Sequence, residues 1–172
     1  MTDSNIKLRK TIDTFIETYL PSKIAEKSEF GEVFTPISMM ETLYERFPKH
    51  VWKTASLKWL DPSGGVGNFP LVLFVMLMNG LSNVFPNEKK RSKHIIENMI
   101  YIVEINSKNY NICKKIFNTI SPESNVNIHQ GDFLKFDPET IHWPKYYNCI
   151  IGNPPYNIGG TGLKGTKRTH II

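Results

Sequence analysis

The stretch SLKWLDPSGGVGNFPLVLFVMLM, residues 56–78, decides the fold class. Residues 56–60 predict a short strand, which runs into the loop Asp61–Gly67, and the apolar run at 69–78 predicts a buried helix. In an open parallel sheet, a turn from strand to helix lies at the carboxyl edge, where ligands bind. Gly65 and Gly67 would let this turn adopt positive φ and approach a ligand closely. Residues 56–78 therefore predict the first strand of an α/β sheet, a ligand-binding turn and a buried helix.

The alternation of strands and helices continues along the chain. Further strands are expected at 99–103, 126–129 and 146–151, and further helices at 87–98 and, capped by Ser107, at 107–117. Two earlier helical patterns cover residues 4–20 and 35–47, the second with Thr35 as its N-cap and Pro36 in its first turn. Because alternating strands and helices imply right-handed crossovers, we expect an α/β fold with a mostly parallel sheet of about four strands. Helices would cover both faces of this sheet, and N-terminal helices would precede it.

Composition narrows the class of protein. The chain has 172 residues, of which 40% are hydrophobic, so it can bury a core. The start of the chain has no signal-peptide pattern, and the apolar run at 69–78 is too short to span a bilayer. Cys113 and Cys149 form no metal-spaced pair, so we expect neither a metal site nor a disulfide scaffold. These features predict a soluble, cytoplasmic domain.

The positive charge is concentrated in two places. The net charge is +5, and residues 87–93 and 157–172 each carry an excess of basic residues. A local excess is what a phosphate-contacting surface requires. For residues 87–93 the simpler interpretation is solvated surface charge.

Two acidic residues follow later strands and extend the predicted ligand site. The loop Asp61–Gly67 lacks the Lys-Ser/Thr of a P-loop and the spacing of a dinucleotide site. Glu104 follows the second strand, where a carboxylate can accept hydrogen bonds from ribose hydroxyls. Asp132 follows the third strand, where it can meet an adenine amino group while Phe133 packs on the ring. Each acid could instead be an ordinary strand-end residue or helix cap, but together they describe a site for a nucleoside-bearing cofactor.

The tetrapeptide Asn153-Pro154-Pro155-Tyr156 is the most informative motif for chemistry. An exocyclic aromatic amine is a poor nucleophile because its lone pair is delocalised into the ring. The side-chain oxygen of Asn153 and the carbonyl of Pro154 can accept hydrogen bonds from the amine and free that lone pair. The two prolines stiffen the loop, and Tyr156 can stack on a planar substrate. The alternative is a proline turn that merely ends a strand.

In order along the chain, these motifs resemble the S-adenosylmethionine-dependent N6-adenine DNA methyltransferases. The resemblance covers residues 29–156 and rests on the segments 32–36 (EVFTP), 61–69 (DPSGGVGNF), 103–104 (VE), 131–133 (GDF) and 153–156 (NPPY). It implies a Rossmann-like class I fold and transfer to the N6 amine of a flipped adenine. The order resembles the subgroup in which a Phe-Thr-Pro segment precedes the cofactor domain, as in many restriction-modification, phage and viral enzymes.

The resemblance also implies roles for matching residues. The residues at the cofactor would be Thr35, Pro36, Asp61, Pro62, Gly65, Gly67, Glu104, Asp132 and Phe133. The catalytic residues would be Asn153, Pro154, Pro155 and Tyr156. Transfer would be a direct displacement from the sulfonium, which needs no metal.

The organisation expected from the resemblance has two parts. Residues 1–50 would form a helical segment with the Phe-Thr-Pro element, and 51–172 a catalytic domain truncated after Tyr156. The fourth strand would lie beside the first, with an open apolar edge at 146–151. We therefore expect the N-terminal part of a larger enzyme that acts on DNA, with a restriction or specificity module elsewhere. The alternatives are a protein-glutamine or RNA amino-group methyltransferase, and a non-catalytic domain that binds cofactor or DNA.

Overall fold

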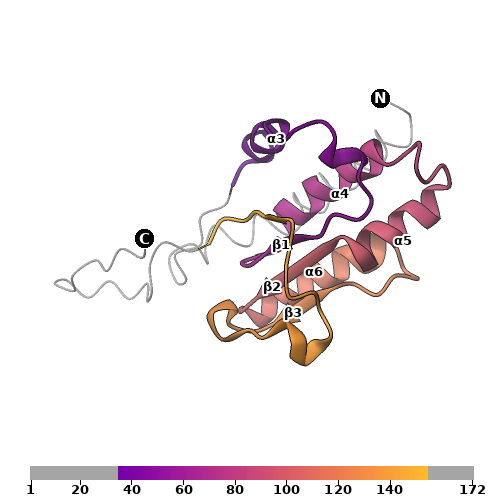
Figure 1. Ribbon diagram of the computed structural model, residues 1–172. Helices are drawn as coiled ribbons and strands as arrows, with labels where there is room; N and C mark the ends of the chain where they lie inside the picture. The colour runs from indigo at the N-terminus through magenta and orange to yellow at the C-terminus, as the bar shows by residue number, and fades with distance from the viewer. Residues whose placement is uncertain (1–34, 155–172) are drawn as a thin grey trace.

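The computed structural model describes residues 35–154 (Figure 1). The helix expected at 4–20 and the basic segment 157–172 lie outside these residues. The elements are, in order, α3 (Ile37–Glu45), η2 (Val51–Lys53), β1 (Trp59–Asp61), α4 (Asn68–Gly80), α5 (Glu88–Asn98), β2 (Ile100–Glu104), α6 (Ser107–Ile120), β3 (Ile128–Gln130), η3 (Phe133–Lys135), η4 (Pro138–Ile141) and β4 (Cys149–Ile150).

The four strands form one parallel sheet in the order β3-β2-β1-β4. Leu60 of β1 lies between Tyr101 of β2 and Ile150 of β4. The predicted parallel sheet is confirmed, and so is the position of the fourth strand beside the first. Among residues 35–154, β4 pairs only with β1 and is shorter than the strand expected at 146–151.

One face of the sheet carries the main hydrophobic core. It is built from alternate strand residues such as Trp59 and Ile102, and from all four described α-helices. The helix α4 is central because it is apolar on nearly every side, as residues 69–78 predict. The hydroxyl of Tyr44 on α3 donates a hydrogen bond to the carbonyl of Phe69 at 3.0 Å, so α3 is fixed to the first turn of α4.

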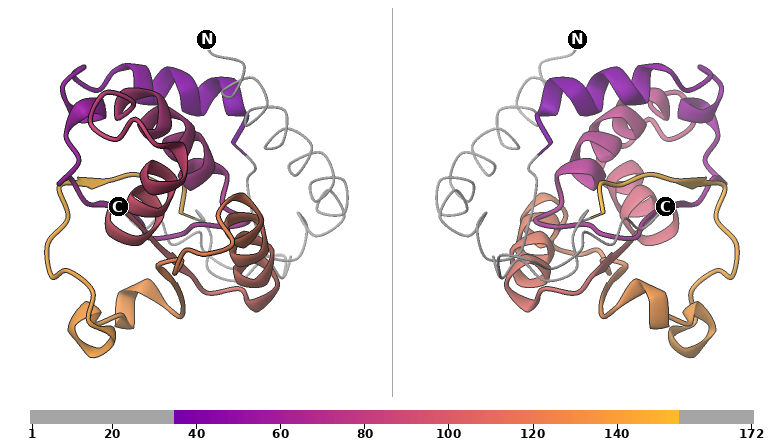
Figure 2. Two further views of the ribbon diagram at one scale, coloured as in Figure 1. Left: turned by 90° about the vertical axis from the view of Figure 1, so that its right-hand side faces the viewer. Right: turned by 90° about the vertical axis from the view of Figure 1, so that its left-hand side faces the viewer.

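The other face of the sheet carries a second, smaller cluster of apolar side chains. Leu60, Tyr101 and Val103 point to this side, where side chains of residues 136–147 pack against them. Figure 2 shows this segment, in orange, on the opposite side of the molecule from α3. Trp143 and Tyr147 lie edge-on to Tyr101, at centroid distances of 5.2 and 5.4 Å. Within the described residues, short 3-10 turns and aromatic side chains cover this face, and two prolines interrupt the segment.

Two helix caps differ from the prediction. Pro36, not Thr35, is the N-cap of α3. Asn106, not Ser107, is the N-cap of α6, because its side chain accepts hydrogen bonds from the backbone N–H groups of Lys108 and Asn109. Asparagine and serine are about equally favoured at the N-cap, so residue type alone does not choose between Asn106 and Ser107.

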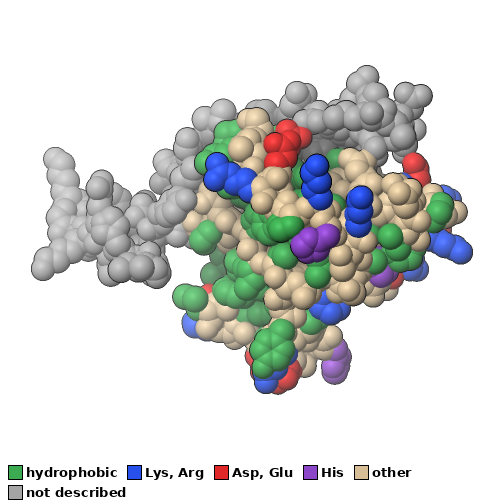
Figure 3. Space-filling model, turned by 45° about the horizontal axis from the view of Figure 1, so that its top comes forward, with side chains coloured by type: hydrophobic (Ala, Val, Ile, Leu, Met, Phe, Trp, Pro, Cys, Tyr) green, Lys and Arg blue, Asp and Glu red, His purple; other side chains and the backbone are tan. Residues whose placement is uncertain are grey.

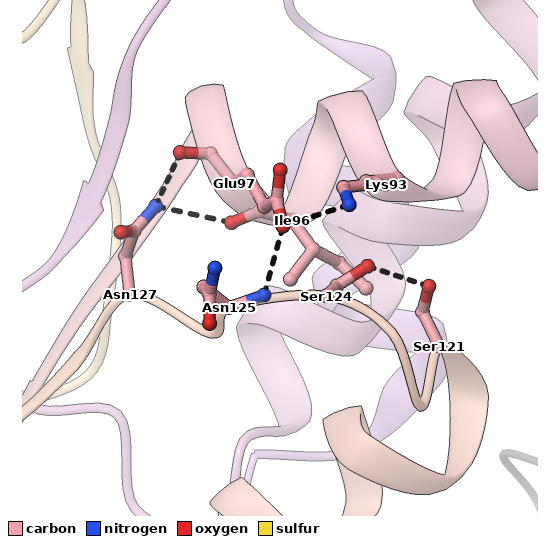
Figure 4. A network of polar contacts seen from close by, with 7 residues as sticks. All are labelled: Lys93, Ile96, Glu97, Ser121, Ser124, Asn125 and Asn127. Carbon is pink, nitrogen blue, oxygen red and sulfur yellow. Dashed lines mark hydrogen bonds and ion pairs between the residues drawn. The ribbon is translucent and has the colours of Figure 1, made fainter.

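The loop before β3 is tied to the end of α5 (Figure 4). The side-chain amide of Asn127 donates to the carbonyls of Ile96 at 3.1 Å and Glu97 at 2.8 Å. The Glu97 carboxylate accepts a hydrogen bond from the backbone N–H of Asn125 at 2.9 Å. These bonds satisfy carbonyls at the helix end and hold β3 beside β2.

The basic residues of α5 do not all lie at the surface. Arg91 is 5% exposed and donates to the carbonyl of Phe85 at 2.7 Å, so its role is structural. Lys89, Lys90 and Lys93 are exposed. On the face shown in Figure 3, lysine and arginine side chains are scattered rather than gathered into one patch. No helix within residues 35–154 is long and apolar enough to span a membrane.

Candidate active site

The carboxyl ends of the four parallel strands bring the predicted site residues to one edge of the sheet. Asp61 ends β1, Glu104 ends β2, and Asp132 and Asn153 follow β3 and β4. Two backbone hydrogen bonds align these ends. The N–H of Gly131 donates to the carbonyl of Glu104 at 3.0 Å, and that of Ile151 donates to the carbonyl of Leu60 at 2.9 Å.

The glycine loop packs closely on β2. The N–H of Gly64 donates to the carbonyl of Val103 at 2.9 Å, and a Cβ on Gly64 would overlap the side chain of Ile102. Gly67 has φ +100, and a Cβ there would lie 2.8 Å from the sulfur of Cys113. Gly65 differs: its φ is +57, but no described atom lies within 4 Å of the position of a Cβ. Gly65 is therefore the position where the loop can be approached from outside.

Asp61 is a buried carboxylate behind this loop. It is 4% exposed, and its Oδ1 accepts a hydrogen bond from the N–H of Ser63 at 3.0 Å. The pKa of Asp61 is raised to about 7, chiefly by burial and also by the negative charge of Glu104, against the lowering effect of the Ser63 hydrogen bond. A carboxylate with this pKa favours a cationic neighbour, because a positive charge would stabilise its ionised form.

Glu104 holds the glycine loop in place. One carboxylate oxygen accepts a hydrogen bond from the N–H of Gly65 at 2.6 Å, and the other accepts one from the N–H of Asn106 at 2.7 Å. Glu104 is only 6% exposed. The sequence predicts that Glu104 binds ribose, but it does not predict these two hydrogen bonds to the backbone. Their only signal in the sequence is an acid at a strand end beside a glycine loop. Each carboxylate oxygen has a second lone pair, so Glu104 can accept these backbone hydrogen bonds and a hydrogen bond from a ribose hydroxyl at the same time.

Asp132 is a cap in this structure. Its side chain accepts a hydrogen bond from the N–H of Leu134 at 3.0 Å, which is the alternative that a strand-end acid leaves open. Phe133 is 38% exposed at the same edge, and Ile105, which directly follows Glu104, is 67% exposed. The sequence analysis missed Ile105, an apolar side chain left in solvent beside a predicted nucleoside site.

Three segments meet at Asn153. Its Nδ2 donates a hydrogen bond to the hydroxyl of Thr35 at 2.9 Å, across 118 positions of sequence. The preceding Gly152 lies against Asp61 and Pro62, since a Cβ on it would overlap the Asp61 carboxylate and lie 3.3 Å from Pro62. The segment after β4 therefore contacts both the end of β1, through Gly152, and Thr35, through Asn153. Sequence reasoning missed Gly152, whose signal is a glycine directly before the Asn-Pro-Pro motif.

The remaining predicted residues are placed as follows. Pro36 and Pro154 are exposed, and Pro62 is half-buried. Pro155 and Tyr156 lie outside the described residues. Burial, and then the charges of Asp61 and Glu104, raise the pKa of the Cys113 thiol well above its usual value, so this cysteine is a core residue. Residues 35–154 contain no cluster of three metal-binding side chains.

The sequence model of the N-6 DNA methylase family matches residues 11–170. The chain belongs to this family. The match spans the glycine loop, both strand-end acids and the Asn-Pro-Pro-Tyr motif, and it includes Thr35.

Two curated relatives support this membership. Over 84 residues, which are 47% of this chain and 20% of the relative, the chain is 36% identical to an uncharacterized adenine-specific methylase of Mycoplasma pneumoniae. Over 164 residues, 95% of this chain and 35% of the relative, it is 26% identical to the modification methylase CviBIII of Paramecium bursaria Chlorella virus NC1A. The chain thus spans between a fifth and about a third of the length of these relatives.

Solved structures show the same fold. A protein of Vibrio vulnificus assigned as a modification subunit of a type I restriction enzyme aligns with a TM-score of 0.58 and 21% identity, covering 91% of this chain and 30% of that one. The DrdV protein in its DNA complex aligns with a TM-score of 0.50 and 19% identity, covering 92% of this chain and 18% of that one. These similarities confirm the predicted Rossmann-like α/β fold.

Proposed function

We propose that the protein transfers a methyl group from S-adenosylmethionine to the N6 amine of adenine in DNA. The observation that carries the proposal is the contact of Gly152 with Asp61, which joins the amine-binding loop to the cofactor loop at one sheet edge. Family membership gives this pair of loops its reaction class. No observation favours a protein or RNA acceptor, and both become arms of the test below.

The residues present fit the cofactor. The turn at Gly65 has the positive φ and the uncrowded approach that close contact with a ligand requires. The buried carboxylate of Asp61 suits the ammonium of the methionine portion. Glu104 would accept hydrogen bonds from the ribose hydroxyls. Phe133 and Ile105 are exposed apolar side chains on which the adenine ring could pack.

Thr35, Pro36, Pro62 and Gly67 would border the same cofactor, and Asp132 would meet its adenine amine. When bound, S-adenosylmethionine supplies an electrophilic methyl group on a sulfonium.

The chain's own residues activate the acceptor amine. The Oδ1 of Asn153 and the carbonyl of Pro154 would accept hydrogen bonds from its two N–H groups and draw the nitrogen towards tetrahedral geometry. Pro155 would keep this loop stiff, and Tyr156 would stack on the extruded base. Extrusion is required because the N6 nitrogen is not accessible for attack inside a duplex. The remaining contribution is positioning, which for a displacement between two bound groups is a large one.

The test uses the full-length protein with tritiated S-adenosylmethionine and mixed-sequence duplex DNA. Digestion to nucleosides should place the label in N6-methyladenine. Parallel reactions with RNA and with a protein mixture measure the two other acceptor classes. Label found only in RNA or protein would overturn the proposal, and it would select the corresponding alternative.

Two variants test whether methyl transfer depends on Asn153 of the Asn-Pro-Pro-Tyr motif. Asn153→Ala should abolish transfer and leave the binding of S-adenosylhomocysteine, the demethylated product, largely unchanged. Asn118→Ala, at an exposed position of α6, is the matched control and should behave as wild type. Undiminished transfer by Asn153→Ala would refute the role given to this residue.

A further inference from the structure

The contact between Thr35 and Asn153 has a geometry that bears on catalysis. The bond is 2.9 Å long and runs from the Nδ2 of the asparagine to the threonine hydroxyl. The family resemblance implies only that Thr35 borders the cofactor and gives it no relation to the Asn-Pro-Pro motif. In the structure Thr35 is a neighbour of the amine-binding group itself.

Both partners of this bond are held by rigid structure. Thr35 lies next to Pro36, the N-cap of α3. Met40 of this helix is completely buried, and the Tyr44 hydroxyl donates to the carbonyl of Phe69 at 3.0 Å. Asn153 follows β4, whose last ladder bond joins the N–H of Ile151 to the carbonyl of Leu60 at 2.9 Å. Neither side chain depends on a long surface loop for its position.

The chemistry of an amide gives the bond a consequence. A donor amine must meet the oxygen of the Asn153 amide, because the nitrogen end would oppose one N–H group with another. In that orientation the nitrogen end needs an acceptor of its own, and the structure supplies the Thr35 hydroxyl. Removing this acceptor would remove the hydrogen bond that fixes the nitrogen end of the amide in the productive orientation.

We propose that Thr35 is a positioning residue that orients the Asn153 amide for the acceptor amine. This inference rests on the proposed function and deepens it. It separates Thr35 from a residue that merely borders the cofactor. A cofactor contact would change cofactor affinity, whereas a positioning role changes the rate of transfer when the protein is saturated.

The experiment compares three variants of the full-length protein. Thr35→Val keeps the shape and removes the hydroxyl, and Thr35→Ser keeps the hydroxyl. Thr42→Val is the matched control, because the Thr42 hydroxyl bonds to the carbonyl of Ser38 at 2.9 Å within α3. Two quantities are measured: the single-turnover rate at saturating S-adenosylmethionine and DNA, and the dissociation constant of S-adenosylhomocysteine by calorimetry.

Thr35→Val should transfer methyl roughly five- to tenfold more slowly, the effect of one net hydrogen bond, with little change in ligand affinity. Thr35→Ser should recover most of the wild-type rate, and Thr42→Val should match wild type in both quantities.

Three results would overturn the inference: an unchanged saturated rate in Thr35→Val, no recovery in Thr35→Ser, or a loss confined to ligand affinity. A wild-type protein that labels no adenine would instead refute the proposed function. The two failures are therefore distinguishable.

Discussion

The buried carboxylate of Asp61 makes cofactor affinity depend on pH in the range where its pKa lies. In the ligand-free protein this pKa is about 7, raised first by burial and then by the charge of Glu104. An ammonium bound within 4–6 Å lowers a carboxyl pKa by about 1–3 units. Binding should therefore release a proton from Asp61 at neutral and mildly acidic pH.

The sign and size of the effect follow from linkage. Below pH 7 the free protein must lose its proton before the charged pair forms, so affinity falls as pH falls. For a shift of about 2 units on binding, the dissociation constant should increase about fivefold from pH 7 to pH 6 and about tenfold by pH 5.5. The ligand's own amino group stays protonated over this range, because α-amino groups titrate near pH 8.

Calorimetry with S-adenosylhomocysteine measures both parts of this prediction. Titrations at pH 5.5, 6 and 7 give the affinity, and buffers of different ionisation enthalpy at pH 6 should report release of most of one proton. Asp61→Asn is the matched control, since an asparagine oxygen can still accept the Ser63 N–H. This variant should bind more weakly at pH 7, and its affinity should vary little with pH.

Stability offers an independent readout of the same titration. A carboxyl whose pKa rises on folding destabilises the ionised protein, and the effect vanishes below the unfolded pKa. Asp61→Asn should therefore raise the free energy of unfolding of the ligand-free protein at pH 8 by about 4 kcal/mol, with little effect near pH 4. A flat affinity profile in wild type, or an equal slope in Asp61→Asn, would refute the assignment of this proton to Asp61.

Four further substitutions separate the packing of the site from its ligand contacts. Gly64→Ala should lower the free energy of unfolding by about 1–3 kcal/mol, because its Cβ overlaps Ile102. Gly65→Ala should cost only about 1 kcal/mol for its positive φ. Its larger effect should be on S-adenosylhomocysteine affinity, and equal losses of affinity in both variants would contradict this distinction. In Glu104→Gln, the amide NH₂ would face one of the two backbone N–H groups from which Glu104 now accepts hydrogen bonds. The free energy of unfolding, measured with denaturant, should fall by about 1–3 kcal/mol, and ligand binding should weaken. Asn127→Ala should lose a similar stability through its freed carbonyl partners while ligand affinity stays at the wild-type value, and a change in affinity would show that this loop reaches the site.

Local pattern was sufficient to predict the elements that place the site. The apolar run at 69–78 predicts α4, and the strand-to-helix turn predicts that Asp61 and Gly65 lie at the carboxyl edge. These features can be predicted because the hydrophobic pattern of consecutive residues indicates both burial and secondary structure. The edge position of Glu104 followed from the same rule applied to the next strand.

The contacts between segments had no local signal. Whether Thr35 caps α3 or serves another residue depends on Asn153, which lies 118 positions away. Asp132 is a different case, because its bond to the N–H of Leu134 is local and a cap was among the roles that the sequence left open. A hydroxyl or carboxylate bonds to whichever partner the fold brings near, so sequence spacing restricts its options without selecting one.

The contact at Gly152 explains why the two halves of the site are coupled. Asp61 is placed by β1 and Asn153 by β4, which are adjacent strands, and a glycine at 152 removes the Cβ that would hold them apart. The group proposed to bind the cofactor's charge therefore touches the residue beside the group proposed to bind the amine. A displacement between two bound groups depends steeply on their relative position. Adjacent parallel strands joined by this contact give that position through the backbone, and Thr35 adds the orientation of the amide.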